Sequence, residues 1–240
     1  MTQAGHMEAV LARSVANRTT PYRWLSRAVA SSAELVVDVA CGAGAMTREL
    51  HRPSRVVIGV DWSAEELALA GARDPGPWVQ ADARALPFRD ASVDAVTTSM
   101  GLAVIEPAEE LVAEAARVLK PGGVFAALVP TVGPASAAEV LLATQLSWAL
   151  KTMLRFPGTL MTGFGAMLGA AGLTKVEDQR ERYRYPVRSR ADAETLLAAI
   201  DLDGVPRGRV DDAIALLGER TVASGEVQVA VPMRRIVAIK

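Results

Sequence analysis

The sequence predicts an α/β protein built on a doubly wound, mostly parallel sheet. Short runs rich in β-branched residues alternate with longer stretches of helical pattern through the middle of the chain. That order is typical of parallel βαβ units. The 240 residues, half of them hydrophobic, suit one α/β domain with a large core.

Five buried strands are expected in the first half of the chain, at residues 35–39, 55–60, 78–81, 93–98 and 124–129. Residues 43–51 are helix-like. Ser63 and Glu66 form a capping box that begins the next helix, and the turn at 74–77 ends it. A further helix is expected over 107–119, with Pro107 in its first turn and the Lys-Pro-Gly-Gly run at 120–123 as its end.

The last third of the chain changes character. Residues 134–153 and 160–171 are expected to form apolar helices around a break at 156–158. Strands are expected at 175–185 and 226–240, separated by a long polar helical segment at 190–221. This order predicts an antiparallel hairpin that closes one edge of the sheet. In the first of these strands Arg180, Arg182 and Arg184 alternate with Glu181, Tyr183 and Tyr185, so the two sets face opposite sides.

Composition excludes several classes of protein. The formal net charge of −1 and the pI near 6.2 give no sign of a nucleic-acid partner. The single cysteine, Cys41, fits a reducing compartment, and residues 1–20 hold no apolar signal segment, so we expect a cytoplasmic protein. The most apolar stretch, at 135–150, is too short and too polar to span a membrane.

The strongest local signal is the run from Val36 to Gly44, where a strand carrying Asp38 enters a Gly-rich turn before a helix. Glycine lets a ligand approach the backbone, and the helix that follows presents unpaired N–H groups. A dinucleotide fingerprint would require a third glycine where Thr47 stands. Taken alone, the pattern also fits a tight strand-to-helix turn with no ligand.

Two more acids end the next two strands. Asp61 follows the second strand, where a carboxylate can accept both hydroxyls of a ribose. Asp82 follows the third, where it can accept from an exocyclic amino group. Each has a simpler interpretation, as a helix cap or as a turn residue. Three acids at three successive strand ends nevertheless favour one shared binding site.

These motifs resemble those of class I methyltransferases that use S-adenosyl-L-methionine (SAM). The run Asp38 to Gly44 is similar to the family's motif I, Val60-Asp61-Trp62-Ser63 to its motif II, and Arg117 to Gly123 to its R-V-L-K-P-G-G turn. The resemblance covers roughly residues 34–130. It implies a seven-stranded Rossmann-like sheet with an antiparallel last strand, SAM as cofactor and no metal ion. It implies the following cofactor-binding residues: Asp38, Ala40, Gly42, Gly44, Asp61, Trp62, Asp82, Ala83, Ser99, Met100 and Leu102.

The resemblance also implies one domain over 1–240, with a helical lid at 1–33, a SAM-binding core at 34–130, a helical insert on the substrate side at 131–172, and C-terminal strands and helix at 173–240. Two positions depart from the family pattern. Ala40 replaces a frequent glycine, and the run Leu102-Ala103-Val104 lacks the histidines of many relatives.

No catalytic residue is assigned from the sequence. The two histidines, His6 and His51, are expected at the surface. Methyl transfer from a sulfonium is an in-line displacement that needs mainly positioning and exclusion of water. Tyr22 and Glu106 are the candidates to assist it.

The acceptor pocket is expected between the N-terminal helices and the segment after the fifth strand. If Trp148, Met153, Phe156, Met161, Phe164 and Met167 line it, the acceptor is apolar or aromatic; the alternative is that they belong to the core. The arginines from 180 to 190 either hold an anion or protect an edge strand. A small-molecule methyltransferase is the leading interpretation. An RNA or protein methyltransferase and a SAM-binding protein that does not methylate stay open, as does the oligomeric state.

Overall fold

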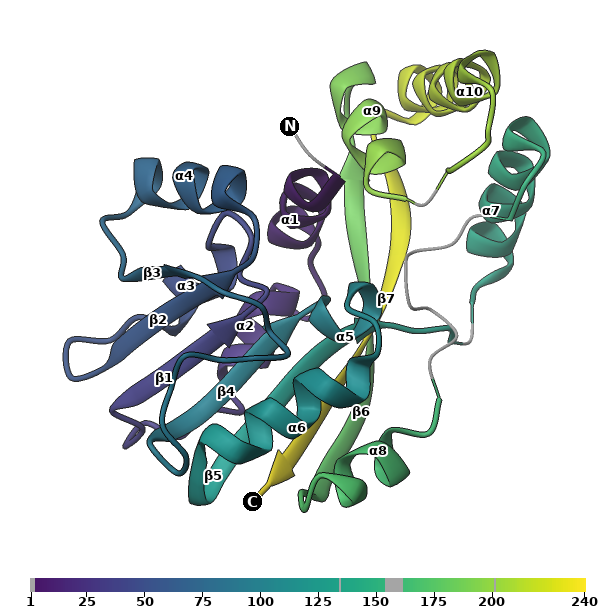
Figure 1. Ribbon diagram of the computed structural model, residues 1–240. Helices are drawn as coiled ribbons and strands as arrows, with labels where there is room; N and C mark the ends of the chain where they lie inside the picture. Colours follow the sequence, from purple (N-terminus) through teal and green to yellow (C-terminus); the bar gives the residue numbers. More distant parts are fainter. Residues whose placement is uncertain (1–2, 134, 154–161, 201) are drawn as a thin grey trace.

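The computed structural model describes residues 3–133, 135–153, 162–200 and 202–240, which fold around one seven-stranded sheet (Figure 1). The strand order is β3-β2-β1-β4-β5-β7-β6, with β1 to β5 parallel and β7 antiparallel between β5 and β6. The predicted fold class, with its antiparallel last strand, is therefore confirmed. The strands are β1 Leu35–Val39, β2 Val56–Asp61, β3 Trp78–Gln80, β4 Val93–Ser99, β5 Leu119–Pro130, β6 Thr174–Val187 and β7 Val227–Ile239.

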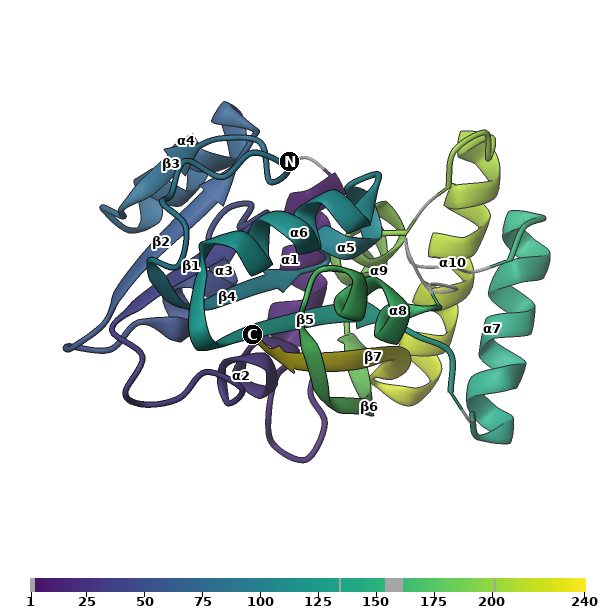
Figure 2. The ribbon, with the colours of Figure 1, turned by 60° about the horizontal axis from the view of Figure 1, so that its bottom comes forward.

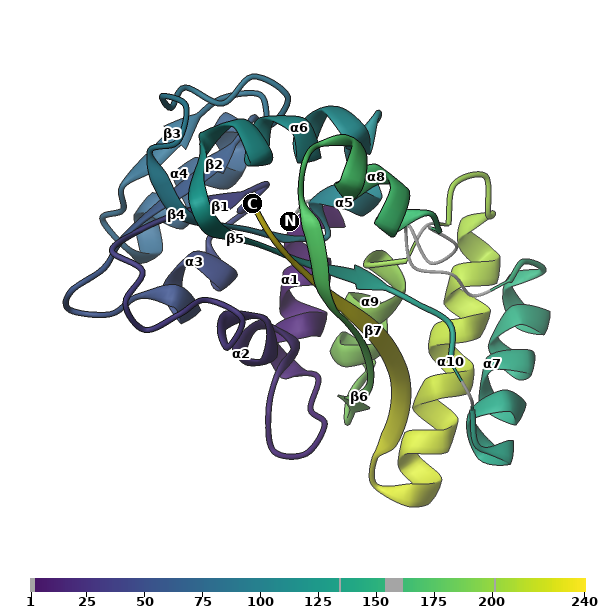
Figure 3. The same cartoon turned by 90° about the horizontal axis from the view of Figure 1, so that it is seen from below.

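Helices cover both faces of the sheet, as a doubly wound fold requires. Figure 2 and Figure 3 show α6 and α8 on one face and α2 and α3 on the other. Each face has its own cluster of buried apolar side chains. The helices are α1 Gln3–Arg13, α2 Pro21–Ser26, α3 Ala45–Leu50, α4 Ala64–Arg73, α5 Gly101–Val104, α6 Ala108–Val118, α7 Ala137–Leu150, α8 Phe164–Ala170, α9 Arg190–Ala198 and α10 Arg207–Ser224.

Several helix ends lie where the local sequence predicts them. The Ser63 hydroxyl accepts from the N–H of Glu66 and begins α4, and Pro107 is the N-cap of α6. Two predictions need correction. Residues 120–123 follow the end of α6, as expected. They belong to strand β5, because their backbone forms hydrogen bonds at the edge of the sheet. The polar segment at 190–221 forms two helices, α9 and α10. A stretch that contains Gly204 and Pro206 separates them.

The hairpin of β6 and β7 extends beyond the rest of the sheet. β7 pairs with β5 only from Met233 onward, whereas its pairing with β6 continues back to Val227 opposite Val187. Along this extension Tyr183 and Tyr185 are buried and Arg184 is exposed, so the predicted alternation is confirmed here. Helices α1 and α9 pack against the extended part, which gives α1 a firm support next to the sheet.

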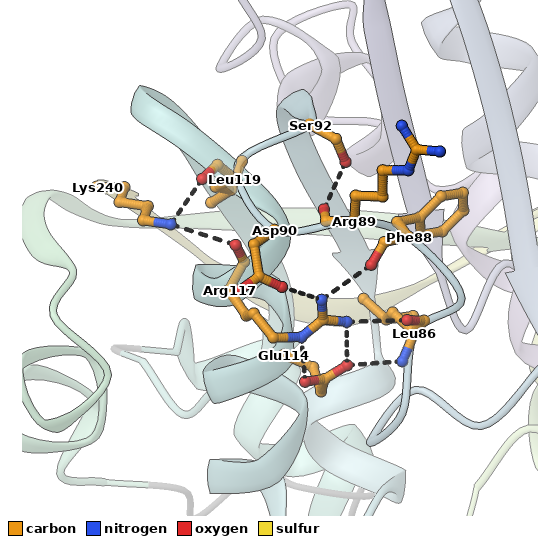
Figure 4. Close-up of polar contacts among 9 residues, drawn as sticks. All are labelled: Leu86, Phe88, Arg89, Asp90, Ser92, Glu114, Arg117, Leu119 and Lys240. Atoms are coloured by element: carbon orange, nitrogen blue, oxygen red, sulfur yellow. Dashed lines mark hydrogen bonds and ion pairs between the residues drawn. The ribbon is translucent and has the colours of Figure 1, made fainter.

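An arginine at the end of α6 organises the loop that follows β3 (Figure 4). Arg117 forms ion pairs with Glu114 at 2.7 Å and Asp90 at 2.6 Å, and it donates to the carbonyl oxygens of Leu86 and Phe88. Glu114 in turn accepts from the N–H of Leu86. The Arg117 guanidinium thus connects α6 to the loop after β3 and provides hydrogen-bond donors for two carbonyl groups of that loop.

We expect Arg117→Met to lower the free energy of unfolding by about 1–3 kcal/mol, because partly buried carbonyls and a carboxylate lose their charged donor. Arg89→Met, at an exposed arginine of the same loop, is the matched control and should change stability little. Urea unfolding of the three proteins checks this. Equal midpoints for Arg117→Met and Arg89→Met would contradict the role given to Arg117.

Candidate functional site

A cavity of about 650 Å³ opens at the carboxyl ends of the parallel strands. Its lining comes from the segments after β1, β2, β3 and β4, and helices α1 and α2 add residues from the N-terminal region. The carboxyl ends of parallel strands are where an open α/β sheet binds its ligands. Most of the predicted site residues meet here: Ala40, Gly42, Asp61, Trp62, Asp82, Ala83, Ser99 and Met100, together with the candidates Tyr22 and Glu106.

Asp61 joins the two loops that form the floor of the cavity. One carboxylate oxygen accepts from the N–H of Gly42 at 2.8 Å, and the other accepts from the N–H of Ser63 at 2.9 Å. Each oxygen has a second lone pair, so the half-buried carboxylate retains capacity for two more donors. Both the fixed position and the spare acceptors suit a pair of ligand hydroxyls.

Ala40, the residue that replaces a frequent glycine of the family, lies in the turn after β1 and has a left-handed backbone conformation. Ala40 has φ 56° and Gly42 has φ 52°. Glycine adopts this region freely, whereas alanine does so at a cost of roughly 1 kcal/mol. The Ala40 methyl group is accommodated opposite Gly101, where an added Cβ would lie 3.2 Å from it and 2.1 Å from the Thr98 hydroxyl. Gly101 thus makes the room that Ala40 occupies.

Asp38 lies beneath this turn and has no exposed surface. Its two oxygens accept from the hydroxyls of Thr47, at 2.7 Å, and Thr97, at 2.9 Å. Burial raises its pKa to about 7, although the two hydroxyls oppose the shift. Asp38 therefore supports the cavity from below, and it is not among the described residues that line it.

Asp82 and Arg84 form one wall of the cavity. The Arg84 guanidinium pairs with Asp82 at 2.8 Å and also donates to the backbone carbonyl of Glu106 at 3.1 Å. It thereby links the loop after β3 to the loop after α5. The hydrogen bonds from Arg84 lower the pKa of Asp82, so this carboxylate stays ionised. Trp62 stands at the same cavity with 80% of its surface exposed.

The N-terminal helices close the opposite side. Glu8 of α1 lines the cavity and forms ion pairs with Arg73 of α4 at 2.7 Å and with Arg48 of α3 at 3.5 Å. Further along α1, Arg13 pairs with Asp192 of α9 at 2.6 Å. The helix therefore spans from the cavity to the C-terminal hairpin, and its acidic end is held over the cavity by two arginines.

Tyr22 of α2 lies in the wall beside Glu8 and Ser99, with 8% of its surface exposed. Burial, reinforced by the negative charges of Glu8 and Asp38, holds the pKa of Tyr22 well above its usual value, while a hydrogen bond with Ser99 opposes the shift. The phenol therefore remains protonated, and its O–H group is able to donate a hydrogen bond.

Sequence reasoning missed two acids of the cavity, Glu8 and Glu66. Glu66 is buried, with 3% of its surface exposed, and faces Gly42 from the first turn of α4. Glu66 lies three residues after the Ser63 cap, so the sequence explains it as part of a helix start. Nothing in that pattern indicates that Glu66 also lines the cavity. Glu8 has no motif around it, so only the packing of α1 could identify it.

Other expected residues lie elsewhere. Leu102 is buried in the core, because α5 turns it toward the apolar cluster under α6. Gly44 is not a lining residue; its missing side chain makes room for the Trp78 ring, which an added Cβ would meet at 2.5 Å. His6 and His51 do not line the cavity either.

The segment 131–172 contributes no lining residue in its described part. Phe164 and Met167 pack into the core under α6, whereas Trp148 and Met153 are exposed. Phe156 and Met161 fall outside the described residues. Ala199, just after α9, lines the cavity instead. Arg180, Arg182 and Arg184 lie on β6 outside the cavity, and Arg182 and Arg184 pair with Glu139.

Comparisons with known proteins agree with this geometry. A family model described as a methyltransferase domain matches residues 37–127. The chain is 32% identical over 173 residues, 64% of its length, to a ubiquinone/menaquinone biosynthesis C-methyltransferase of Rubrivivax gelatinosus, of which it covers 68%. It is 42% identical over 90 residues, 38% of its length, to a demethylmenaquinone methyltransferase of Corynebacterium kroppenstedtii, of which it covers 39%.

Among solved structures, the YcgJ protein of Bacillus subtilis has the same fold. The two chains superpose with a TM-score of 0.62 at 20% identity, over 92% of this chain and 97% of that one.

The raised pKa of Asp38 predicts a pH dependence of stability. The folded state binds this proton more tightly than the unfolded chain does, so the stability present below about pH 4 is lost as the pH rises toward 7. In Asp38→Asn this loss is absent. We expect the stability of the wild type relative to Asp38→Asn to fall between pH 4 and 7, by on the order of 4 kcal/mol at most.

Urea unfolding of both proteins across this range, without ligand, measures the difference. Asp178 is a useful internal contrast: its pKa is lowered, with the hydrogen bonds from Arg234 as the largest cause, so Asp178→Asn should have its largest effect at high pH. A constant gap between the wild type and Asp38→Asn at every pH would show that Asp38 is ionised in both states.

Proposed function

Because the chain belongs to the family of SAM-dependent methyltransferases, we propose that it methylates a small, largely apolar aromatic acceptor of the hydroquinone type. The enzyme class and the cofactor follow from the family; the acceptor is the proposal. Two things support it. Both curated relatives named above carry the names of quinone-pathway methyltransferases. The cavity also combines several carboxylates with apolar side chains in its lining, and this combination carries the proposal.

The residues at the floor fit SAM. The left-handed turn at Gly42 leaves backbone open to a ligand, and Asp61 has spare acceptors for ribose hydroxyls. The acids Glu8, Glu66 and Asp82 line the same cavity, and Asp38 lies below it. A cavity with this excess of carboxylates favours a cation, and SAM carries a sulfonium and an ammonium.

The walls suit an apolar acceptor. Met7, Met46 and Met100 line the cavity, and methionine side chains adapt to apolar and aromatic surfaces. Arg84 is the cation among the described lining residues, and Asp82 already binds it. An anionic acceptor would therefore meet carboxylates without a free basic partner, whereas a neutral ring would bury apolar surface at no such cost.

When bound, SAM supplies a methyl group that is already activated for displacement. The chain's residues then have to align the acceptor and exclude water. We assign Tyr22 the task of orienting the acceptor, since its protonated hydroxyl lies in the cavity wall and is able to donate a hydrogen bond. Glu106 stands at the exposed end of the cavity, where a carboxylate can accept the acceptor's proton and pass it to solvent.

The proposal is tested by incubating the protein with methyl-labelled SAM and short-chain hydroquinones, and by mass analysis of the products. We expect one methyl group on the ring. At low SAM concentration the yield of labelled hydroquinone should fall about tenfold for Asp61→Asn, because the amide replaces a carboxylate that accepts from both backbone N–H groups. Calorimetry with S-adenosylhomocysteine should show about tenfold or greater loss of affinity.

Glu65→Gln, at an exposed acid of the same segment, is the control and should bind like the wild type. Binding of S-adenosylhomocysteine without methylation of any acceptor would favour a SAM-binding protein that does not methylate. Label found only in RNA or protein would show that the acceptor is a macromolecule and not a small molecule.

A further inference from the structure

Helix α7 carries an exposed apolar face at the edge of the described part of the molecule. Figure 1 and Figure 3 show it farther from the sheet than α10, against which it packs. Leu142, Leu146 and Leu150 form its buried side. On the opposite side Leu141 is 54% exposed and Trp148 is 74% exposed, seven residues apart and therefore two turns along one face.

The exposed face continues with Val140, 52% exposed, and with Met153 just beyond the helix, 63% exposed. A helix that is apolar all round is usually buried on all sides. Because α7 is apolar on its outer face as well, that face is suited to a partner.

The exposed charge on α7 itself is basic. Residues 137–153 hold two charged side chains, Glu139 and Lys151. Glu139 is turned inward, 12% exposed at its side chain, and pairs with Arg182 and Arg184. Lys151 is exposed, and its ammonium lies 4.4 Å from the centre of the Trp148 ring. The Arg184 side chain, 55% exposed, adds a second positive group near the start of the helix.

We propose that this face of α7 docks on an anionic lipid surface. Tryptophan next to lysine is the pairing that anchors helices at the membrane interface, with the ring among the headgroups and the ammonium near the phosphates. Glu139, the one acidic side chain of α7, is turned inward and paired with two arginines, so α7 itself presents no outward negative charge to the lipid. No helix in the described part of the chain is long and apolar enough to cross a bilayer. The contact is thus peripheral.

A second copy of the chain fits this face less well. The four exposed side chains contribute at most ~250 Å² each when fully exposed, and they are 52% to 74% exposed. They offer less than the ~800 Å² per partner of a standard interface. Weak, reversible attachment to lipid requires no such area.

The inference rests on the proposed function, because an apolar hydroquinone dissolves in the bilayer. An enzyme held at the surface by α7 would meet such an acceptor where it is concentrated. Attachment would raise the rate with long-chain acceptors in vesicles and leave the rate with short, water-soluble ones unchanged.

The test is co-sedimentation with vesicles of phosphatidylcholine alone and of phosphatidylcholine with phosphatidylglycerol. We expect the wild type to bind the second kind more strongly, in a salt-sensitive manner. Leu141→Glu and Trp148→Ser should each weaken partitioning about tenfold. Val56→Glu is the matched control, since Val56 is 53% exposed on β2 and gains the same charge. It should bind like the wild type.

Urea unfolding and S-adenosylhomocysteine binding, unchanged in Leu141→Glu, would show that this variant is folded. The proposal is overturned if the wild type co-sediments with neither kind of vesicle, or if Leu141→Glu and Val56→Glu bind vesicles equally well. A dimer in sedimentation equilibrium that Leu141→Glu dissociates, without vesicle binding, would assign the face to a second copy. Because vesicle binding is measured without an acceptor, its failure is distinct from a failure to methylate short-chain hydroquinones.

Discussion

The in-register pairing of β1 with β2 and β4 is the constraint on which the cavity depends. Asp38 lies opposite Gly59 on one side and Thr97 on the other. This register places the Thr97 hydroxyl against the Asp38 carboxylate and brings Asp61 to the N–H of Gly42. A slip of one residue would turn each of these side chains to the other face of the sheet. The acids gather at one edge because parallel strands end together.

Much of this arrangement is predictable from the sequence, because it is local. The Gly42 turn, the Asp61 strand end and the Ser63 cap are each read from a few adjacent residues, and parallel βαβ topology brings the strand ends together. The resemblance to methyltransferases implies Ser99 and Met100, which lie at the end of β4 and line the cavity. The resemblance to methyltransferases supplied the strand count and the roles, which periodicity alone does not give.

The rest depends on contacts between distant segments. Glu8 reaches the cavity because α1 is held between Arg73 of α4 and Tyr185 of the β6–β7 hairpin, which are 65 and 172 residues away in sequence from their partners on α1. Leu102 shows the converse: the resemblance to methyltransferases implies a lining position, but the short helix α5 turns Leu102 into the core. The apolar composition of α7 is compatible with a pocket wall. Its packing against α10 shows that its outer apolar side faces away from the cavity.

The electrostatics of the cavity bear on how a site without histidine can work. Asp38 is the described group beside the cavity whose pKa lies near neutrality, but two hydroxyls enclose it below the floor, where no acceptor can reach it. Tyr22 reaches the cavity but holds its proton. In the reaction we propose, proton removal is left to exposed groups such as Glu106 and to solvent, after or alongside transfer of the methyl group. Under the proposed function such a site obtains its rate from alignment, so the packing of α1 and α2 beside the cavity matters more than any single base.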